Sequence, residues 1–407
     1  MRQASRPYPN VRGLARQWAC ANRQCGRTMS RINRQAPRQQ RVQRERHRHR
    51  EHARCIRMRR VLEHADHPRA DVAAEAARRK QNASRAQARA LLPSSRFDRP
   101  GRSDVTSTSG DIRIGISGWR YEGWRGTFYP KGLKQADELQ YASHRMQTIE
   151  INGTHYSLQS LGSWQHWYDE TPPGFTFSVK GARYLTHMLR FRDDSATVAC
   201  ANFFAQGLLV LKDKLGPILW QFPPSLRFDP EHIAHFLSLL PHDTEAAHAL
   251  TKQHDRRVRT PYVHVDETRA LRHAIEVRHA SFVDPAFVKL LRRHKVALVV
   301  SDSTEPWPQL EDLSADFVYM RLHGTKTKYS GEYSDAALEQ WARRIESWSR
   351  GEQPRDAHLA APDLSPPRAR TRDVYCYFDN DAKTNAPFDA QRLMERLGLH
   401  ARAAAAG

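Results

Sequence analysis

Polar side chains alternate with apolar ones in a short β-rich stretch of this 407-residue chain. In "TIEINGTHY" (148–156), two isoleucines alternate with Thr148, Glu150 and Asn152. Because successive side chains of a strand point to opposite faces, the isoleucines share one face and the polar residues share the other. If both faces are covered, as in a parallel sheet, Glu150 needs a partner or a chemical role.

Charged residues occupy matching positions at the ends of other β-rich stretches. They are Lys180, Glu276, Arg278, Asp302, Arg321 and His323. Side chains of these types act as general acids and bases, or hold anions, in enzyme active sites. If the fold brings them together, they form a cluster able to bind a small substrate and transfer protons.

Eight β-rich stretches alternate with helix-like segments from residue 111 onward. The predicted strands are 112–116, 148–151, 175–179, 217–222, 274–278, 297–301, 317–322 and 374–378, and the clearest helices are 136–146, 230–240, 284–294, 334–348 and 389–397. Several helices begin at Asp, Ser or Pro, which suit a helix start. The alternation predicts a parallel sheet covered by helices, and the number eight favours closure into a barrel.

We therefore predict an α/β fold, a (β/α)8 TIM-type barrel over residues 105–400, followed by a tail of small residues at 401–407. The alternative is an open doubly wound sheet. Against it, "GISGW" (115–119) lacks the G-x-G-x-x-G turn after the first strand. The connections 241–273 and 349–373 are expected to be loops or surface excursions.

A closed barrel directs one set of alternate side chains inward and the other toward the helices. With the apolar set on the helix side, the inward set is Thr148, Glu150, Asn152, Thr176, Ser178, Lys180, Leu219, Gln221, Glu276, Arg278, Asp302, Tyr319, Arg321, His323, Tyr375, Tyr377 and Asp379. Barrel enzymes hold their chemistry at the C-terminal strand ends, where the charged members gather. This placement predicts a polar mouth.

Three acids and three cations leave this mouth formally balanced. We expect Glu276 or Glu150 to act as a base, with His323 or Asp302 as its acid partner. The residues expected to bind substrate are Trp119, Asn152, Tyr156, Lys180, Gln221, Arg278 and Arg321. The alternative is a network of buried ion pairs that ties the strands together.

Lys180 has two interpretations of its own. It is a counter-ion for Glu150 or Glu276, or it is a Schiff-base nucleophile whose pKa is lowered by burial or neighbouring cations. A metal held by carboxylates and His323 is a further alternative. No local spacing motif supports a metal, so none is expected, and no pattern identifies a cofactor.

Aromatic residues are concentrated in the first long loop, "SGWRYEGWRGTFYP" (117–130). Trp119 begins this group, and Tyr156 and Tyr184 follow the second and third predicted strands. Aromatic side chains beside a polar mouth suit stacking on a sugar or a base. The alternative is that the loop's aromatics pack it against the barrel rim.

The net charge of +21 belongs to the first quarter of the chain. Residues 1–104 hold 27 Lys+Arg and 8 Asp+Glu, a balance of +19, whereas the remaining 38 and 36 leave +2. This segment has too few apolar residues to offset chain ordering, so we expect it to be disordered. Three interpretations are open. The true translation start could be Val105, in which case the segment is not part of the natural protein; otherwise it is a solvated tail or an arm that binds nucleic acid.

Cysteine content and hydropathy argue against a disulfide-rich, a zinc-binding or a membrane-spanning protein. Five cysteines, an odd number, make a disulfide framework unexpected, and the spacing of Cys20 and Cys25 lacks a second pair for zinc. No apolar run approaches the roughly 20 residues of a membrane helix, and no signal peptide is seen. We expect a cytoplasmic protein with no membrane partner, and the oligomeric state is left open.

The succession of motifs resembles the YecE-like family, domain-of-unknown-function family 72. The motifs are "GISGWRYEGWRGTFYP", "TIEINGTHY", "TPPGFTFSVKGARYLTH", "LGPILWQFPP", "EVRHASF", "SDS", "DFVYMRLHG" and "YFDNDAKTNAP". The resemblance spans roughly 111–398 and implies a TIM-type barrel of unassigned role. It adds Asn380 and Asp381 to the residues expected at the pocket.

Three functions follow as hypotheses. The first is an enzyme that performs acid–base chemistry, a hydrolysis or an isomerisation, on a small polar or anionic substrate at the barrel mouth. The second is a lyase that forms a Schiff base at Lys180. The third is a non-catalytic protein that binds a ligand, or nucleic acid through residues 1–104.

Overall fold

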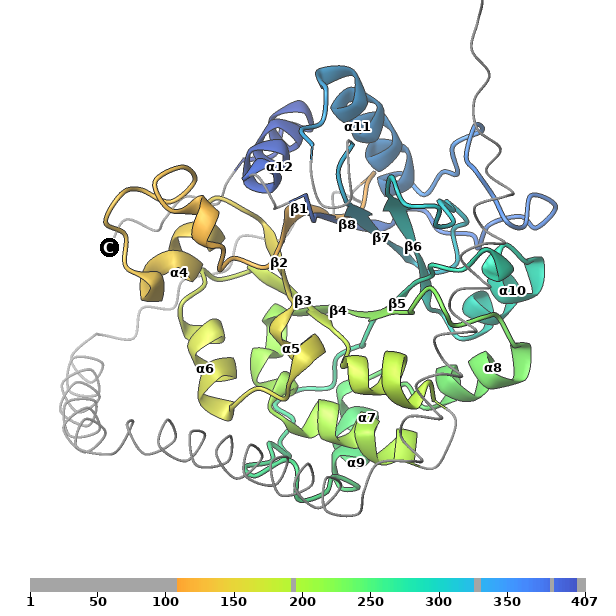
Figure 1. Ribbon diagram of the computed structural model, residues 1–407. Helices are drawn as coiled ribbons and strands as arrows, with labels where there is room; N and C mark the ends of the chain where they lie inside the picture. The colour runs from red at the N-terminus through yellow and green to blue at the C-terminus, as the bar shows by residue number, and fades with distance from the viewer. Residues whose placement is uncertain (1–107, 192–194, 326–330, 381–383, 401–407) are drawn as a thin grey trace, which may run out of the picture. The chain divides into compact units, whose positions relative to one another are not determined.

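The computed structural model describes residues 108–191, 195–325, 331–380 and 384–400. Its strands pair in chain order and close into one parallel barrel (Figure 1). They are β1 Ile112–Ser117, β2 Thr148–Ile151, β3 Thr176–Lys180, β4 Leu215–Gln221, β5 His273–Glu276, β6 Ala297–Asp302, β7 Phe317–Leu322 and β8 Asp373–Phe378. The predicted (β/α)8 barrel is confirmed, and each predicted strand overlaps an observed one.

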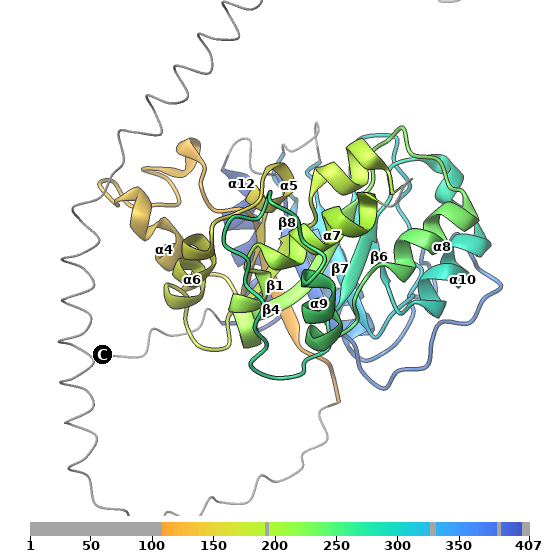
Figure 2. The same ribbon diagram turned by 90° about the horizontal axis from the view of Figure 1, so that it is seen from below.

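Helices surround the strands on the outside of the barrel (Figure 1). They are α4 Glu138–Ser143, α5 Gly153–Tyr156, α6 Leu161–Asp169, α7 Ser195–Ala205, α8 Pro230–Ser238, α9 Thr244–Thr251, α10 Pro285–Arg293, α11 Asp335–Ser349 and α12 Asn385–Arg396. A π-helix, Tyr184–Leu189, follows β3. Figure 2 shows the barrel from the side, with α8 and α10 packed next to each other.

Local sequence signals explain where several helices begin. The side chains of Asp229 and Asp284 accept hydrogen bonds from the first turns of α8 and α10. A proline follows each of these aspartates, and its fixed φ and missing N–H suit the first helical position. Ser334 caps α11 in the same way. These caps set where the covering helices start after the strand ends.

Two apolar clusters lie on the two faces of the barrel wall. The larger one packs the strands against the helices and includes Ile149, Ile151 and Met320. The smaller one fills the barrel interior and consists of Leu219, Ala274, Ala297, Val299, Ala315, Phe317, Tyr319, Tyr375 and Tyr377. The strand alternation therefore places apolar residues on both faces, and the charged residues continue the inward face toward the C-terminal strand ends.

One of the two expected surface excursions contains a helix. Within 241–273, α9 packs against α7 and buries Thr244, Ala247 and Thr251. The expectation of a loop is wrong there, because Asp243 caps a short segment with one apolar side. The segment 349–373 carries no helix between α11 and β8 among the residues described.

No single helix in the described ranges is long and apolar enough to cross a membrane. Within the same ranges, α7 and the short 3-10 helix Leu208–Lys214 together have the length and apolar composition of a membrane span, but an angle of 55° separates their axes. Three sequence predictions fall outside the described residues: disorder in 1–104, the tail 401–407, and the placement of Asp381.

Candidate functional site

Arg321 lies at the centre of a charged cluster inside the C-terminal end of the barrel. Its side chain is 1% exposed and projects inward from β7. The guanidinium donates to both carboxylate oxygens of Glu150, at 3.1 and 3.0 Å, and to Glu276 at 2.8 Å. It also donates to Asp379 at 2.9 Å. One cation therefore joins carboxylates from three strand ends.

Glu150 is fully engaged by this cluster. Besides the two bonds from Arg321, its carboxylate accepts from Ser117 at 2.7 Å and from the Tyr319 hydroxyl at 2.6 Å. The hydroxyl of Tyr319 also lies 2.6 Å from that of Ser178. The Glu150 carboxylate therefore accepts hydrogen bonds from three different side chains. Glu150 therefore anchors Arg321.

Glu276 lies on β5 and is fully buried. Its carboxylate accepts from Gln221 at 2.9 Å and from the Arg278 Nε at 2.8 Å, in addition to Arg321. Burial by itself would raise the pKa of Glu276, but the charges of Arg278 and Arg321 outweigh it and hold the pKa well below its usual range. Glu276 is therefore ionised, and its proton affinity is low.

His323 bridges two of the carboxylates. Its Nδ1 lies 2.9 Å from Asp379 Oδ2, and its Nε2 lies 3.6 Å from Glu276 Oε1. Burial raises the pKa of Asp379, but Arg321 and His323 outweigh burial and the pKa falls below its usual range. A carboxylate at Nδ1 orients the imidazole ring and leaves Nε2 as its second functional nitrogen.

Trp307 completes one wall of the cluster. The Arg278 guanidinium carbon lies 3.8 Å from the centre of the Trp307 ring, in a cation–π contact. The same ring meets His323 edge-on, with ring centres 5.9 Å apart. Trp307 therefore restrains both the cation and the imidazole.

Lys180, the last residue of β3, is the ionisable group of the mouth with the fewest partners. It is 8% exposed, and no described side chain accepts a hydrogen bond from its Nζ. Burial, and then the charge of Arg321, lowers its pKa to about 8, although the carboxylates of Glu150, Asp379 and Glu276 oppose this. Close to neutral pH, Lys180 can therefore change its protonation state.

Asp302 does not join the cluster. In the register of β6 and β7, Ser301 pairs with Arg321, and Asp302 pairs with Leu322. Asp302 consequently faces the helices, where its carboxylate is hydrogen-bonded to Tyr333 and Trp341 and burial raises its pKa. The expectation that it points into the barrel is wrong, and Asp379 supplies the third carboxylate instead.

The predicted binding residues divide between the cluster and its surroundings. Gln221, Arg278, Arg321 and Lys180 are brought together. Asn152 joins them through its Nδ2, which donates to Ser117 Oγ at 2.9 Å. Their role in binding a substrate stays a prediction.

Trp119, Tyr156 and Asn380 lie outside the cluster. Trp119 is 6% exposed and packs edge-on against Trp167, at 5.6 Å between ring centres. Tyr156 is 71% exposed and lines a separate cavity. Asn380 donates to Gly331 O at 2.9 Å and to Asp389 at 2.8 Å, so it connects the segment before α11 with α12.

The first long loop is held mainly by its own aromatic residues. Trp124, Phe128 and Tyr129 are buried and contact one another and Tyr141. This arrangement is the packing alternative considered for the loop. Stacking on a sugar or a base stays a prediction for the exposed residues Tyr156 and Tyr184.

Four residues of the cluster are not among the site residues predicted from the sequence: Ser117, Trp307, Tyr319 and Asp379. Tyr319 and Asp379 belonged to the predicted inward set, and Ser117 stands beside Glu150 in the register of β1 and β2. Strand phase could have found these three. Trp307 lies in the loop after β6, where no periodicity guides a prediction.

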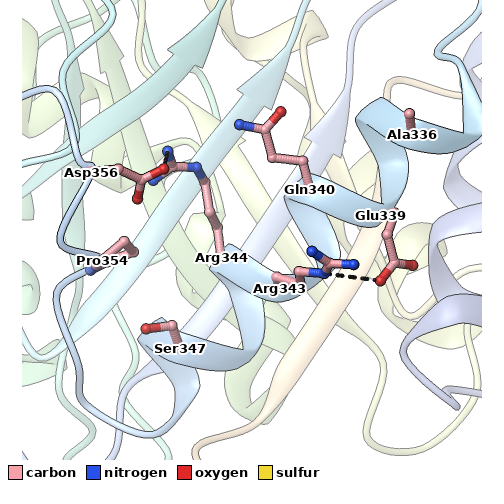
Figure 3. Close-up of a pocket in the computed structure, with 8 residues that line it drawn as sticks. All are labelled: Ala336, Glu339, Gln340, Arg343, Arg344, Ser347, Pro354 and Asp356. Atoms are coloured by element: carbon pink, nitrogen blue, oxygen red, sulfur yellow. Dashed lines mark hydrogen bonds and ion pairs between the residues drawn. The ribbon is translucent and has the colours of Figure 1, made fainter.

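A cavity of about 480 Å³ lies away from this cluster, beside α11 (Figure 3). Its charged residues pair with each other, Arg343 with Glu339 and Arg344 with Asp356. It lacks the convergent buried groups of the mouth, which therefore remains the candidate site.

The family described as "Protein of unknown function DUF72" matches residues 113–406, a range that includes all of β1 except Ile112 and the whole of β2 to β8. The chain belongs to the DUF72 family. The resemblance in the sequence motifs is thereby confirmed. The family accounts for the barrel and leaves its reaction unassigned.

A curated relative and two solved structures are similar to this DUF72 protein, and the two structures share its fold. The UPF0759 protein YunF of Bacillus subtilis (strain 168) is 28% identical over 127 residues, which are 30% of this chain and 44% of YunF, less than half its length. The solved structure of a DUF72 protein from Thermotoga maritima MSB8 is 24% identical, with a TM-score of 0.54, and 71% of this chain and 99% of that chain are covered. One from Enterococcus faecalis V583 is 16% identical, with a TM-score of 0.52 and coverage of 73% and 100%.

The charged groups of this DUF72 barrel have no metal-binding arrangement among the described residues. No three His, Cys, Asp or Glu side chains in those ranges are grouped so that they could hold an ion. Glu150, Glu276 and Asp379 instead direct their oxygens at Arg321.

Proposed function

We propose that the mouth of this DUF72 barrel is the active site of an enzyme that transfers a proton on a small polar or anionic substrate. Lys180 is the group that exchanges the proton, and Arg278 and His323 hold the substrate beside it. The observation that carries the proposal is the state of Lys180: a nearly buried amine with a pKa of about 8 and no described hydrogen-bond acceptor.

The carboxylates are less suited to the role of base that the sequence suggested for them. A general base works best when its pKa lies near the working pH. Glu276 has a pKa far below that range, and Glu150 already accepts from Arg321, Ser117 and Tyr319. We assign both carboxylates to positioning: they fix Arg321, whose charge helps to lower the pKa of Lys180.

Lys180 is close to its transition at neutral pH. With a pKa of about 8, roughly one molecule in ten carries the neutral amine at pH 7. The neutral form accepts a proton from a carbon or oxygen acid, and the charged form returns it. Hydrolysis and isomerisation both use such an exchange.

The Schiff-base lyase is the second candidate, and the same lowered pKa favours it. A neutral Lys180 amine would attack a carbonyl carbon, and loss of water would leave an imine. The two candidates differ in one respect. The imine is a covalent intermediate that borohydride reduces to a stable secondary amine.

The test uses carbonyl compounds that carry hydroxyl or phosphate groups, incubated with the protein in D2O. Proton transfer predicts exchange of deuterium at the carbon next to the carbonyl, detected by NMR, and loss of this exchange in Lys180→Met. Borohydride trapping is run in parallel and mapped by mass spectrometry. Lys214, a buried lysine whose Nζ is bonded to Thr171 O at 2.5 Å, serves as the internal control.

Each outcome selects one answer. Exchange that is lost in Lys180→Met, without a trapped adduct, supports proton transfer. An adduct on Lys180 but not on Lys214 supports the Schiff base. Exchange that persists in Lys180→Met, with no adduct trapped on Lys180 of the wild type, rules out both assignments of Lys180.

A further inference from the structure

A second cavity lies beside the mouth, against the segments that follow β2 and β3. It encloses about 300 Å³, and its lining includes His155, Tyr156, Leu158, Tyr184, Asn202 and Arg257. Two of its residues are bonded to the backbone at the end of β3: Thr154 Oγ1 donates to Lys180 O at 2.6 Å, and His155 Nδ1 lies 2.8 Å from Gly181 O. The cavity and the mouth therefore share one wall.

Three exposed apolar side chains, Tyr156, Leu158 and Tyr184, line this cavity, and a fourth, Met188, lies in the same π-helix as Tyr184. Tyr156 is 71% exposed, Met188 64%, and Leu158 and Tyr184 are each 36% exposed. They come from two short segments, 156–158 and 184–188, and the second of these lies in the π-helix. Exposed apolar groups that cluster in this way mark an interaction site rather than ordinary surface. Two of the four are tyrosine rings, which offer flat faces for stacking.

The surroundings of the cavity are cationic. The Arg257 guanidinium carbon lies 5.4 Å from the centre of the Tyr184 ring, and Arg183 precedes Tyr184 in the chain. His187, whose ring centre lies 5.2 Å from that of the lining residue His155, is affected by the local charge. Burial lowers its pKa to about 4, together with the charges of Arg183, Arg278, Lys180 and Arg190.

Among the described residues, Asp255 contacts Arg257 and Asn202, two residues of the cavity lining. Asp255 Oδ2 lies 3.4 Å from Arg257 Nη1, and Asp255 Oδ1 also accepts from Asn202 at 3.1 Å. A single oxygen of Asp255 contacts the guanidinium, and the Arg257 side chain is 55% exposed, which leaves room for a second anion. Arg183 is exposed, and no described side chain pairs with it.

We infer that this cavity binds a nucleotide unit, with its base stacked on Tyr156 or Tyr184 and its phosphate near Arg183 and Arg257. Exposed aromatic rings next to arginines are the combination that recognises unpaired bases and their phosphates. A nonaromatic anion would leave the tyrosines unused, and a neutral aromatic ligand would leave the arginines unused. This inference does not rest on the reaction proposed for Lys180.

The nucleotide unit has two sources, a free nucleotide and a single-stranded nucleic acid. The sequence suggested nucleic-acid binding only through residues 1–104, whereas this cavity belongs to the barrel. Because a basic segment adds affinity for any phosphate chain, the test must isolate the stacking contribution. The measurement must therefore detect contact with the base of the ligand, because binding that depends on phosphate charge alone would not distinguish the cavity from the basic segment.

The experiment uses the full chain and saturation-transfer NMR, with AMP, adenosine, inorganic phosphate and a ten-residue oligothymidylate as probes. We expect transfer to the base protons of AMP and of the oligonucleotide. Tyr156→Leu combined with Tyr184→Leu should reduce the affinity of the base-bearing probes at least about fivefold, the lower limit for loss of one stacked base. Phe388→Leu, which changes an aromatic residue that is 44% exposed on α12, is the matched control and should leave affinity unchanged.

Arg257→Gln tests the phosphate contact, with Arg343→Gln on α11 as its control. Arg257→Gln should weaken the binding of AMP and leave the binding of adenosine unchanged.

The relative affinity of the two base-bearing probes identifies the source of the nucleotide. If the tyrosine variant loses AMP binding and the wild type binds the oligonucleotide no more tightly than AMP, the result supports a free nucleotide. If the wild type binds the oligonucleotide more tightly than AMP, and the tyrosine variant loses this binding too, the result supports a single-stranded nucleic acid.

Two results would overturn the inference: no saturation transfer to base protons from any probe, or equal affinity of wild type and the tyrosine variant. Lys180→Met separates this outcome from the proposed reaction. It should abolish deuterium exchange and retain binding of AMP at the cavity.

Discussion

Arg321 on β7 and Glu150 on β2 form a two-point ion pair, although their strands are not neighbours in the barrel wall. The pair crosses the barrel interior and lies above the inner apolar cluster. Because the guanidinium is planar, two parallel donors fix its orientation toward the carboxylate. The remaining nitrogen, Nη1, then donates to Glu276, and Nη2 donates to Asp379 as well as to Glu150.

Replacement of Arg321 by methionine should destabilise the protein strongly. Removal of the cation leaves three buried carboxylates without their common partner, and breaking a buried pair costs about 3–5 kcal/mol. Urea unfolding of Arg321→Met measures the loss. Arg343→Met is the control, since Arg343 forms an ion pair but is 76% exposed, and its change should stay within about 0.5 kcal/mol. Equal stability of the two variants would show that the cluster does not hold the barrel together.

Tyr319→Phe should cost more stability than Tyr377→Phe. The Tyr319 hydroxyl donates to the charged Glu150, whereas the Tyr377 hydroxyl lies 2.9 Å from the neutral Thr148 hydroxyl. A hydrogen bond to a charged group contributes about 1.5–3 kcal/mol, and a neutral one about 0.5–1.5 kcal/mol. Both tyrosines are fully buried inside the barrel, so lost packing is matched. The order of the two unfolding free energies tests whether the hydrogen bond from Tyr319 to the Glu150 carboxyl is the stronger of the two.

Stability should depend on pH through Lys180 between about pH 8 and 10.5. Its folded pKa of about 8 lies below the ordinary value of 10.5, so in this window the unfolded chain holds the proton and the folded protein has released it. The unfolding free energy of wild type therefore rises with pH, by on the order of 3 kcal/mol across the window. Below pH 8 both states are protonated, and the buried charge opposes folding.

Lys180→Met should lack this rise, so the difference in unfolding free energy between wild type and variant grows with pH. Lys289→Met, at an exposed position of α10, should follow wild type at each pH. Parallel curves for wild type and Lys180→Met would mean that Lys180 titrates at its ordinary value. The active-site role proposed for its amine would then lose its basis.

Gly181→Ala should displace the end of β3. A Cβ at this position would come within 2.3 Å of a ring atom of the buried Trp220, and the backbone N–H of Gly181 is bonded to Leu219 O at 2.7 Å. Overpacking of this kind costs about 1–3 kcal/mol. The variant should also change the reactivity of the Lys180 amine toward acylating reagents. Gly123→Ala is the control, because the nearest atom would lie 4.0 Å away.

Strand positions and the inward set could be predicted from the sequence, because alternation is visible wherever polar and apolar residues take turns. "TIEI" and "FVYMRL" show this, and their inward residues Glu150, Tyr319 and Arg321 meet in the structure. The stretch "ALVVSD" shows no such alternation, so its phase is ambiguous and Asp302 was assigned to the wrong face. A shift of one residue exchanges the two faces of a strand.

The partner choices inside the mouth could not be predicted. Three acids and three cations allow several pairings, and the observed one depends on distances across the barrel that no local pattern encodes. The same limit applies to Trp307, which reaches Arg278 from a loop. It also applies to Tyr156, whose sequence position after β2 suggested the mouth, whereas its side chain lines the neighbouring cavity.

The position of Asp379 has a consequence for how the chain is made. Arg321 contacts Glu150 from 171 residues earlier and Glu276 from 45 residues earlier, whereas Asp379 lies 58 residues later, just beyond β8. Until the ribosome has released that last strand, β1 lacks its second neighbour and the mouth holds one more positive than negative charge. Synthesis of β8 therefore closes the ring of strands and neutralises the mouth in the same event. A nascent barrel that has not finished translation would expose both an open strand edge and an uncompensated cation to the chaperones around it.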